Sequence, residues 1–327
     1  MKQSKHSALR RMLLGGIISA LNYPFLTVAK SLCNKPLLIV FPFSNVSFGI
    51  ARNLFDLYFR KIWPCPILTE FKPGAGGIIG TQYAKQHSLI EPTLLVASAT
   101  ISTINYLLHP EANLGERTYW KPVSLLYSEP LALVSTPKFA SSYKGAIDLI
   151  KKNPYKFNYG SVGKGSSIHL LMLLLLKQLN LEMVHIPYKS NGLQVALMSG
   201  EIDLCFTTLE FAEAYQASGM MKILACTSER RLESYPDIPT LAEYIPNFSI
   251  DFNLGMMASE NTPASQIQEV NNTINQILVN PEFKKSCNLP GLNLAKPHPP
   301  SYFGEVLNKE LQFWSALIAR IGQENIT

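Results

Sequence analysis

Four segments rich in glycine, serine and threonine are the parts of this sequence best suited to bind a ligand. They are residues 43–45, 72–77, 98–100 and 160–167, and each lies between a strand-like apolar run and a helix-like run. A helix start offers unpaired backbone N–H groups and the positive end of the helix dipole, and serine adds hydroxyl donors. The segments therefore predict a site for a small anion. Glycines that only turn the chain tightly into a helix give the same pattern, and this alternative stays open.

Glycine-rich segments can also mark nucleotide sites, but the spacing here does not match one. A P-loop needs Gly-x4-Gly-Lys-Ser/Thr, and the segment around Lys164 has neither that spacing nor the hydroxyl after the lysine. The dinucleotide fingerprint needs a glycine three residues after Gly76, where this chain has Ile79. Nucleotides are therefore not the predicted ligands.

The sequence offers no recognisable set of catalytic or metal-binding residues. Its six histidines form no HExxH pair, Gly-x-Ser-x-Gly is absent, and the five cysteines lack any CxxC spacing. We interpret His169 and His185 as structural histidines, while Asp203 either binds donors in a cleft or anchors a loop. We predict a protein that is not an enzyme and has no cofactor or metal. A hydrolase or lyase would need a nucleophile and base that the sequence does not show.

Length and composition fit an ordinary globular chain with two packed lobes. With 327 residues, 47% of them hydrophobic and 16% charged, the chain is too long for one small module and too apolar for a disordered protein. The strongest internal apolar run, residues 170–176, is much shorter than the ~20 residues that cross a bilayer. An integral membrane protein is therefore not predicted.

Basic residues are concentrated at the amino terminus. Five of the 29 lysines and arginines lie in the first thirty residues, which contain no Asp or Glu, and the rest of the chain is close to neutral. A nucleic-acid-binding protein would keep a basic stripe on its folded part, because phosphate neutralisation supplies most of its affinity. Nucleic acid is therefore not a predicted partner.

The amino terminus has the order of a secretory signal peptide. A basic stretch ends at Arg10 and Arg11, an apolar run covers residues 12–21, and small residues follow near 29–31. We predict a signal peptide at residues 1–33 and a mature chain in the periplasm. The alternative of an ordinary first helix is weakened by glycines and a proline in this stretch. The arginine pair leaves a twin-arginine export route open.

Runs of strand length and helix length alternate along almost the whole chain. The predicted strands are residues 36–43, 66–71, 93–97, 131–135, 156–159, 183–186, 202–207, 222–227 and 253–258. The predicted helices are residues 51–61, 74–86, 101–108, 143–152, 166–179, 192–199, 263–279 and 302–321. This alternation predicts an α/β fold in which each lobe is a mostly parallel sheet flanked by helices. Ligands bind where loops leave the carboxyl ends of such strands, which is where the four segments lie.

Several phrases of the sequence together resemble one family. In chain order they are PGAGGIIGT at 73–81, NYGSVGKGSSIHL at 158–170, HIPYK at 185–189 and PDIPTLAE at 236–243. These phrases, within a resemblance that covers nearly all of residues 37–323, are similar to the solute receptors of tripartite tricarboxylate transporters, also called Bug receptors. The resemblance implies a periplasmic receptor with the type II periplasmic-binding-protein fold, whose two α/β lobes close on a small organic acid.

The resemblance also implies the site, the lobes and the partners. In receptors of this family, the carboxylates of the ligand are expected to be held largely by backbone amides, hydroxyls and waters instead of a fixed arginine clamp. Carried over position by position, the ligand-binding residues are Phe43, Ser44, Asn45, Ser98, Thr100, Ser161, Ser166, Ser167 and Asp203. We predict lobe 1 at residues 34–133 and 228–327 and lobe 2 at residues 134–227. The implied partners are a small carboxylate and membrane transporter subunits, and the receptor is expected to be a monomer.

The first loop departs from the family pattern. Members continue the first strand as Pro-aromatic-x-x-Gly-Gly-x-x-Asp-x-x-Ala-Arg, whereas Pro42 to Arg52 is two residues shorter, lacks the glycine pair and has Phe48 in place of the Asp. The Asp-Gly-Tyr before the third strand is also replaced, by residues 90–92. Three alternatives therefore stay open: a receptor for an altered acid, a receptor that no longer binds, and a sensor subunit that presents the acid to a membrane kinase.

Overall fold

The computed structural model describes residues 35–44, 49–188, 192–246 and 248–326. The predicted signal peptide and Asn45 lie outside these residues. The strands are β1 (Leu37–Phe41), β2 (Ile67–Phe71), β3 (Thr93–Ala97), β4 (Trp120–Ser135), β5 (Asn158–Ser161), β6 (Val184–Pro187), β7 (Leu204–Thr208), β8 (Lys222–Cys226), β9 (Asp251–Ser259) and β10 (Asn293–Leu294). The α-helices are α2 (Gly49–Ile62), α3 (Ile78–His87), α4 (Asn105–Leu108), α5 (Tyr143–Lys152), α6 (Ser167–Leu179), α7 (Gly192–Ser199), α8 (Leu209–Ala217), α9 (Ala264–Val279), α10 (Pro281–Ser286) and α11 (Pro300–Ile321).

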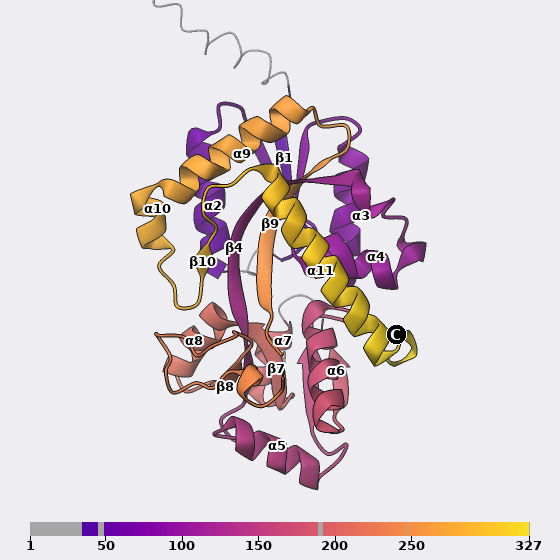
Figure 1. The fold of residues 1–327 in the computed structure, drawn as a ribbon, viewed down its shortest axis with the longest axis vertical. Coiled ribbons are helices and arrows are strands. Elements are labelled where there is room, and N and C mark those ends of the chain that lie inside the picture. The colour runs from indigo at the N-terminus through magenta and orange to yellow at the C-terminus, as the bar shows by residue number, and fades with distance from the viewer. Residues whose placement is uncertain (1–34, 45–48, 189–191, 247, 327) are drawn as a thin grey trace, which may run out of the picture. The chain divides into compact units, whose positions relative to one another are not determined.

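Two groups of parallel strands are joined through β9 and β4. In sheet A, β2 and β3 pair in parallel with β1, and β9 pairs antiparallel with both β3 and β4. In sheet B, β6 and β7 pair in parallel with β5, while β7 and β8 pair antiparallel with β4. The strand order is β2-β1-β3-β9-β4-β7-β5-β6, with β10 added to β4 in sheet A. Figure 1 shows β4 and β9 running side by side through the middle of the fold. The predicted α/β fold is confirmed.

The long strand β4 changes its partners between Pro130 and Leu131. Residues up to Pro130 pair with β9, and residues from Leu131 onward pair with β7 and β8. Proline has no N–H to donate, so it ends a ladder. The N–H of Leu131 instead donates to Oγ1 of Thr227 at 2.8 Å, and the N–H of Thr227 donates to the Leu131 carbonyl at 2.8 Å. β4 therefore passes from sheet A to sheet B between Pro130 and Leu131. The predicted bounds of the two lobes stay a prediction.

Each sheet has its own buried apolar cluster. The cluster of sheet A includes Leu38, Val40, Leu95, Trp120 and Phe303. The cluster of sheet B includes Val134, Leu197, Ile202, Cys205 and Leu209. β1 and β3 are buried along their whole length and, apart from Thr93, apolar, as expected for parallel strands with helices on both faces. In the described part of the chain, no helix combines the length and the apolar character that a membrane span requires.

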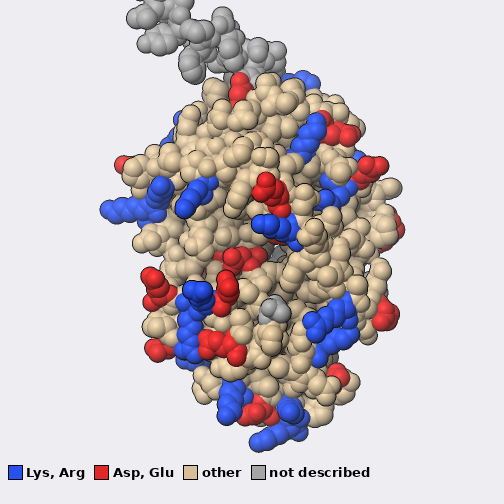
Figure 2. All heavy atoms as spheres, viewed as in Figure 1, with Lys and Arg blue, Asp and Glu red and all other residues tan. Residues whose placement is uncertain are grey.

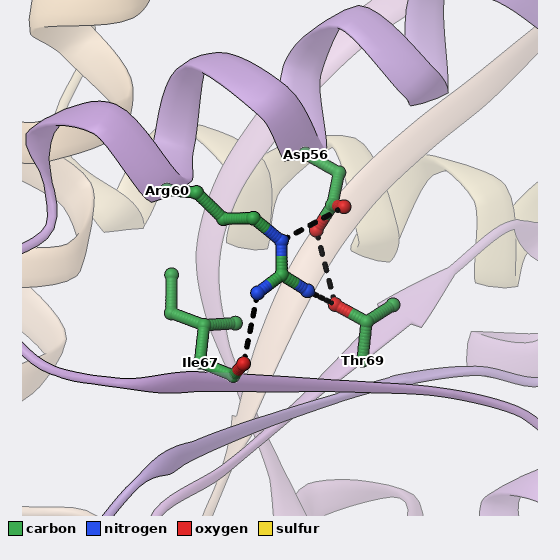
Figure 3. A network of polar contacts seen from close by, with 4 residues as sticks. All are labelled: Asp56, Arg60, Ile67 and Thr69. Carbon is green, nitrogen blue, oxygen red and sulfur yellow. Dashed lines mark hydrogen bonds and ion pairs between the residues drawn. The ribbon is translucent and has the colours of Figure 1, made fainter.

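A polar network holds α2 against β2, the edge strand of sheet A (Figure 3). Arg60 Nε donates to Asp56 Oδ2 at 3.2 Å, and Arg60 Nη1 donates to the Ile67 carbonyl at 2.8 Å. Thr69 Oγ1 donates to Asp56 Oδ1 at 3.1 Å and accepts a hydrogen bond from Arg60 Nη2. Because α2 follows the first candidate loop, this network fixes the helix into which that loop leads.

Candidate functional site

The predicted ligand loops leave the carboxyl ends of β1, β3 and β5. In the first loop, Ser44 is 8% exposed, and its carbonyl accepts a hydrogen bond from Arg52 Nη1 at 3.3 Å. Phe43 is partly buried against the apolar cluster of sheet A. In the loop after β3, the Ser98 carbonyl accepts hydrogen bonds from Ile101 N and Ser102 N, both at 2.9 Å. These contacts tie each loop to the helical turn that follows it.

Two of the predicted residues, Thr100 and Ser167, join the turn after β3 of sheet A to the start of α6, the helix after β5 of sheet B. Thr100 Oγ1 donates to Ser167 Oγ at 3.3 Å and accepts from Ser167 N at 3.2 Å. Thr100 begins the π-helical turn Thr100–Ile104 after β3, and Ser167 is the first residue of α6. The exposed fractions of Thr100 and Ser167 are 8% and 9%. The amino end of α6, with its backbone N–H groups, therefore lies against the loop after β3.

Ser161 and Ser166 maintain the shape of the loop after β5. Ser161 Oγ donates to the Gly163 carbonyl at 2.9 Å and lies 2.8 Å from Nε2 of His185. Ser166 is the N-cap of α6, because its Oγ accepts from His169 N at 3.4 Å. The same Oγ donates to the Gly163 carbonyl at 2.8 Å. Both hydroxyls are thus engaged inside the loop, and their contribution to a site is to hold its backbone.

Two stacked histidines lie beneath this loop. The ring centroids of His169 and His185 are 4.0 Å apart, and His185 also stacks on Tyr159 at 4.9 Å. His169 Nδ1 accepts a hydrogen bond from Gly165 N at 3.0 Å, which requires that this nitrogen carry no proton. Burial, the neighbouring His185 and Lys164 lower the pKa of His169 to about 3. Burial and Lys164 lower the pKa of His185 to about 4, so both rings are neutral near pH 7. Their contacts fit a structural role.

Asp203 lies at the opposite end of β5 from the other predicted residues. Its Oδ2 accepts a hydrogen bond from Asn158 N at 2.9 Å, and its own N–H donates to Asn158 Oδ1 at 3.1 Å. Asn158 begins β5 and Ser161 ends it, so the structure does not bring Asp203 together with the loop. Of the two interpretations from the sequence, these contacts favour the anchor of a loop.

The glycine-rich turn after β2 allows close packing. A Cβ atom on Gly80 would lie 2.6 Å from Pro42 Cα and 2.7 Å from the Lys72 carbonyl, distances at which atoms clash. Glycine at this position therefore lets α3 approach the chain just before the first loop. Gly77 is in the left-handed region with φ 91°, which an L side chain rarely adopts. The contacts of this segment favour packing over ligand binding.

Tyr127 and Glu129 on β4 were not predicted as site residues. They are 2% and 1% exposed, and neither Tyr127 Oη nor Glu129 Oε2 has a hydrogen-bond partner among the residues that the structure describes. This part of β4 was not predicted as a strand, because prolines at 122 and 130 interrupt the apolar run. The sequence nevertheless contained a sign that Glu129 is unusual, since it is the only charged residue between Lys121 and Lys138.

The described residues show no cation centre and no reactive thiol. None of their His, Cys, Asp and Glu side chains form a group of three or more that could hold a metal ion. Burial raises the pKa of Cys205 and of Cys226 to about 12, which keeps both thiols protonated. On the face shown in Figure 2, basic and acidic side chains are interspersed.

A family model described as the tripartite tricarboxylate transporter family receptor matches residues 50–323. The chain belongs to this family. The match confirms the predicted membership of the Bug receptors, and it covers the loops after β3 and β5 together with every strand of both sheets except β1. This chain is therefore a member of a family of periplasmic solute-binding receptors.

Relatives and solved structures agree with this assignment. A UPF0065 protein of Bordetella pertussis is 30% identical over 276 residues, which cover 82% of this chain and 84% of that protein. The structure of the periplasmic binding protein BugD matches with a TM-score of 0.79 at 24% identity, covering 88% of this chain and 98% of that one. MatC from Rhodopseudomonas palustris with bound malate matches with a TM-score of 0.77 at 22% identity, covering 87% and 98%. The two structural matches show the predicted two-lobed fold of periplasmic binding proteins.

Proposed function

We propose that this receptor captures a small organic carboxylate between two lobes and delivers it to the membrane subunits of a tripartite tricarboxylate transporter. The observation that carries the proposal is the contact between Thr100 and Ser167, which joins the loops at the strand ends of sheets A and B. An acid held at this contact would meet the amino end of α6, where backbone N–H groups and the helix dipole favour negative charge.

Three further points support a carboxylate receptor. MatC, a structural neighbour, has malate bound. The described part of the loops offers backbone N–H groups, which suit an anion that is held without a metal. The neutral, stacked histidines keep the backbone of the loop after β5 in place instead of acting as general bases. We therefore propose binding without turnover, and a bound acid should be recovered chemically unchanged after prolonged incubation.

The proposal also covers the location and organisation of the receptor. We assign residues 1–33 to an export signal and the mature monomer to the periplasm, where the transporter subunits would receive the acid. We assign lobe 1 to residues 34–133 and 228–327 and lobe 2 to residues 134–227. Closure of the lobes would be favoured by the contacts that the acid makes with both of them.

The variant Thr100→Val tests the proposed site. It removes the hydroxyl that accepts from Ser167 N and leaves that buried N–H without a partner, at a cost of about 1–3 kcal/mol to the closed state. We expect the affinity for a binding dicarboxylate, measured by calorimetry with malate, succinate and adipate, to fall roughly ten-fold. Ser166 is a less suitable test, since its replacement would also remove the cap of α6.

The control for this test is Thr103→Val in the same helical turn. The hydroxyl of Thr103 lies 3.4 Å from Ser102 Oγ, a contact within its own turn. We expect this variant to bind as the wild type does. Equal affinity of the Thr100 variant and the wild type would remove the contact between the sheets from the site, and no binding of any small carboxylate would refute the proposed function.

A further inference from the structure

Two buried polar groups that lie two residues apart on β4, just before Pro130, have no partner in the described part of the chain. Glu129 Oε2 and Tyr127 Oη each lack a hydrogen bond there, and the two residues are 1% and 2% exposed. Leaving a buried polar group unpaired costs about 1–3 kcal/mol, so such groups are rare without a ligand or ordered water to complete them. Two of them within one short stretch of strand call for a common explanation.

The two side chains lie on the same face of β4. Tyr127 pairs with Leu254 and Glu129 pairs with Phe252 in one unbroken register, and residues two apart on a strand point to the same side. Glu129 is directly followed by Pro130, after which β4 passes from sheet A to sheet B. The pair is therefore placed at the junction of the two sheets.

Titratable groups on helices packed on both sheets act electrostatically on this pair. Arg52 on α2, Glu210 on α8 and Cys287 after α10 all act electrostatically on Tyr127, and Glu210 also acts on Glu129. Arg52 is 4% exposed and donates to the carbonyl of Ser44 in the first ligand loop. The pair is thus within electrostatic range of α2, which follows the first loop, and of the first turn of α8, which follows β7.

Glu129 keeps its proton at neutral pH. Burial, and to a smaller extent Glu210, raise the pKa of its carboxyl to about 8. Burial and Glu129 also raise the pKa of Tyr127, whereas Arg52 acts in the opposite direction. Both side chains are therefore uncharged O–H donors near pH 7. Asp251, paired with the neighbouring Pro130, also has its pKa raised by burial, so the junction does not favour additional negative charge.

We propose that Glu129, as a neutral carboxylic acid, and Tyr127 donate hydrogen bonds to a carboxylate group of the ligand, so that the receptor binds an organic anion together with a proton. This inference rests on the proposed function and specifies its chemistry. An anion gains two buried donors without the cost of desolvating a fixed cation. The O–H···O⁻ bonds are charge-assisted and stronger than neutral ones.

The proposal fixes the sign of the pH dependence. A carboxyl with a raised pKa is protonated below about pH 8 and ionises above it, and an ionised Glu129 would repel the carboxylate of the ligand. The affinity should therefore be flat near pH 6–7 and fall as the pH rises above 8, approaching ten-fold per pH unit. Binding near pH 8 should take up protons from the buffer, and a bound anion raises the pKa of Glu129 further.

Calorimetry with malate, succinate and adipate between pH 6 and 9.5, in buffers of different ionisation enthalpy, tests this. Glu129→Gln keeps a neutral donor, so we expect affinity within a few-fold of the wild type at pH 7, no fall above pH 8 and no proton uptake by this site. Tyr127→Phe should lose about ten-fold in affinity at every pH below 8.

The matched control is Glu310→Gln on α11. Glu310 is 9% exposed, and burial raises its pKa to about 7, but its Oε1 is bonded to Asn253 Nδ2 at 3.0 Å. This variant should keep the pH profile of the wild type above pH 8. Identical pH profiles of the wild type and Glu129→Gln would overturn the inference while leaving the proposed function intact. That result would assign Glu129 to an ordered buried water.

A measurement without any acid keeps the two proposals separable. Because folding raises the pKa of Glu129 from 4.5 to about 8, the folded state binds more protons within this window, and stability falls as the pH rises through it. In the Glu129→Gln variant, the free energy of unfolding measured by urea denaturation should lack this contribution to the fall between pH 5 and 8. An unchanged slope would show that Glu129 is ionised and would refute the inference, whatever the acids do. Failure of every acid to bind the wild type would refute both proposals.

Discussion

Single residues set the chemistry of the loop after β5, and its histidines are the most sensitive of them. His169 Nδ1 accepts from Gly165 N, and Ser161 Oγ, which donates to the Gly163 carbonyl, must accept from Nε2 of His185. The network therefore requires a neutral His169 with its proton on Nε2, and it requires a proton on Nε2 of His185. The lowered pKa of His185 keeps that ring neutral near pH 7 as well. A second proton on His169 would turn the acceptor for Gly165 N into a donor and open the loop.

We predict that acid destabilises this receptor through these rings. In the unfolded chain both histidines titrate near 6.5, whereas in the folded state their pKa values are about 3 and 4. Stability is fully present above pH 6.5 and is lost as the pH falls from there toward 4, by at most about 1.4 kcal/mol per pH unit for each ring. His185→Gln keeps an N–H donor at the Nε2 position, so its urea-unfolding free energy should fall less between pH 6.5 and 4.5. An equal fall in both proteins would contradict the neutral stack.

Among the structural elements, β4 has the greatest consequence for function, because it passes through both sheets. Its continuity depends on Thr227, whose Oγ1 accepts from Leu131 N at 2.8 Å and donates to the Ile250 carbonyl at 2.6 Å. The backbone of Thr227 pairs with the same two residues, since Ile250 N donates to its carbonyl at 2.9 Å. One side chain thus completes the ladder at the point where Pro130 cannot.

Thr227→Val should therefore destabilise the protein strongly, although the two side chains are similar in size. It leaves the buried N–H of Leu131 and the carbonyl of Ile250 without this partner, and we expect a loss of about 2–4 kcal/mol in urea denaturation. The control is Thr273→Val on α9, whose Oγ1 donates to the Glu269 carbonyl within its own helix. A loss of less than about 1 kcal/mol for the Thr227 variant would show that the ladder does not depend on its hydroxyl.

The sequence predicts elements well where turn residues separate them and poorly where they do not. The strand at 93–97 and the helices at 143–152 and 192–199 agree with β3, α5 and α7 at both ends. α8 was missed because it begins at Leu209, directly after the last residue of β7, with no intervening glycine or proline. The first part of β4 was missed because Pro122 lies within it, at a register shift of its pairing with β9. Such irregular pairing depends on tertiary contacts that local patterns do not contain.

Candidate site residues follow the same division. The carry-over from the family indicated Thr100 and Ser167, and the structure brings them into contact between the two loops. Asp203 was carried over in the same way but lies at the far end of β5. The distinction between the two ends of a four-residue strand needs the register of β5 against β7, which sequence spacing alone does not give. Tyr127 and Glu129 could be recognised as neighbours on one face only once residues 120–130 were known to form a strand, and the sequence did not predict that strand.

In the molecule as a whole, the proposed acid acts as a link between two sheets that are already connected in other ways. β4 and β9 form one connection, and Lys177 at the end of α6 forms another, because its Nζ donates to the Arg320 carbonyl at 2.6 Å. α11, which ends at that contact, packs along β4 in sheet A and reaches α6 beside sheet B (Figure 1). A ligand at the contact of Thr100 and Ser167 would therefore add a further link between two sheets that β4, β9 and α11 already connect.

Hydrogen exchange then distinguishes a site shared by both sheets from a site in one of them. We predict that a saturating dicarboxylate slows amide exchange in peptides covering 98–108 and in peptides covering 160–170 at the same ligand concentration. A ligand at 100 times its Kd stabilises the closed form by about 2.7 kcal/mol, a slowing of roughly 100-fold in amides that exchange through opening. Peptides from α9 serve as the internal control, because this helix packs on sheet A near β4 and α2. Protection confined to 98–108 would place the acid on sheet A alone, and the amino end of α6 would then have no part in holding it.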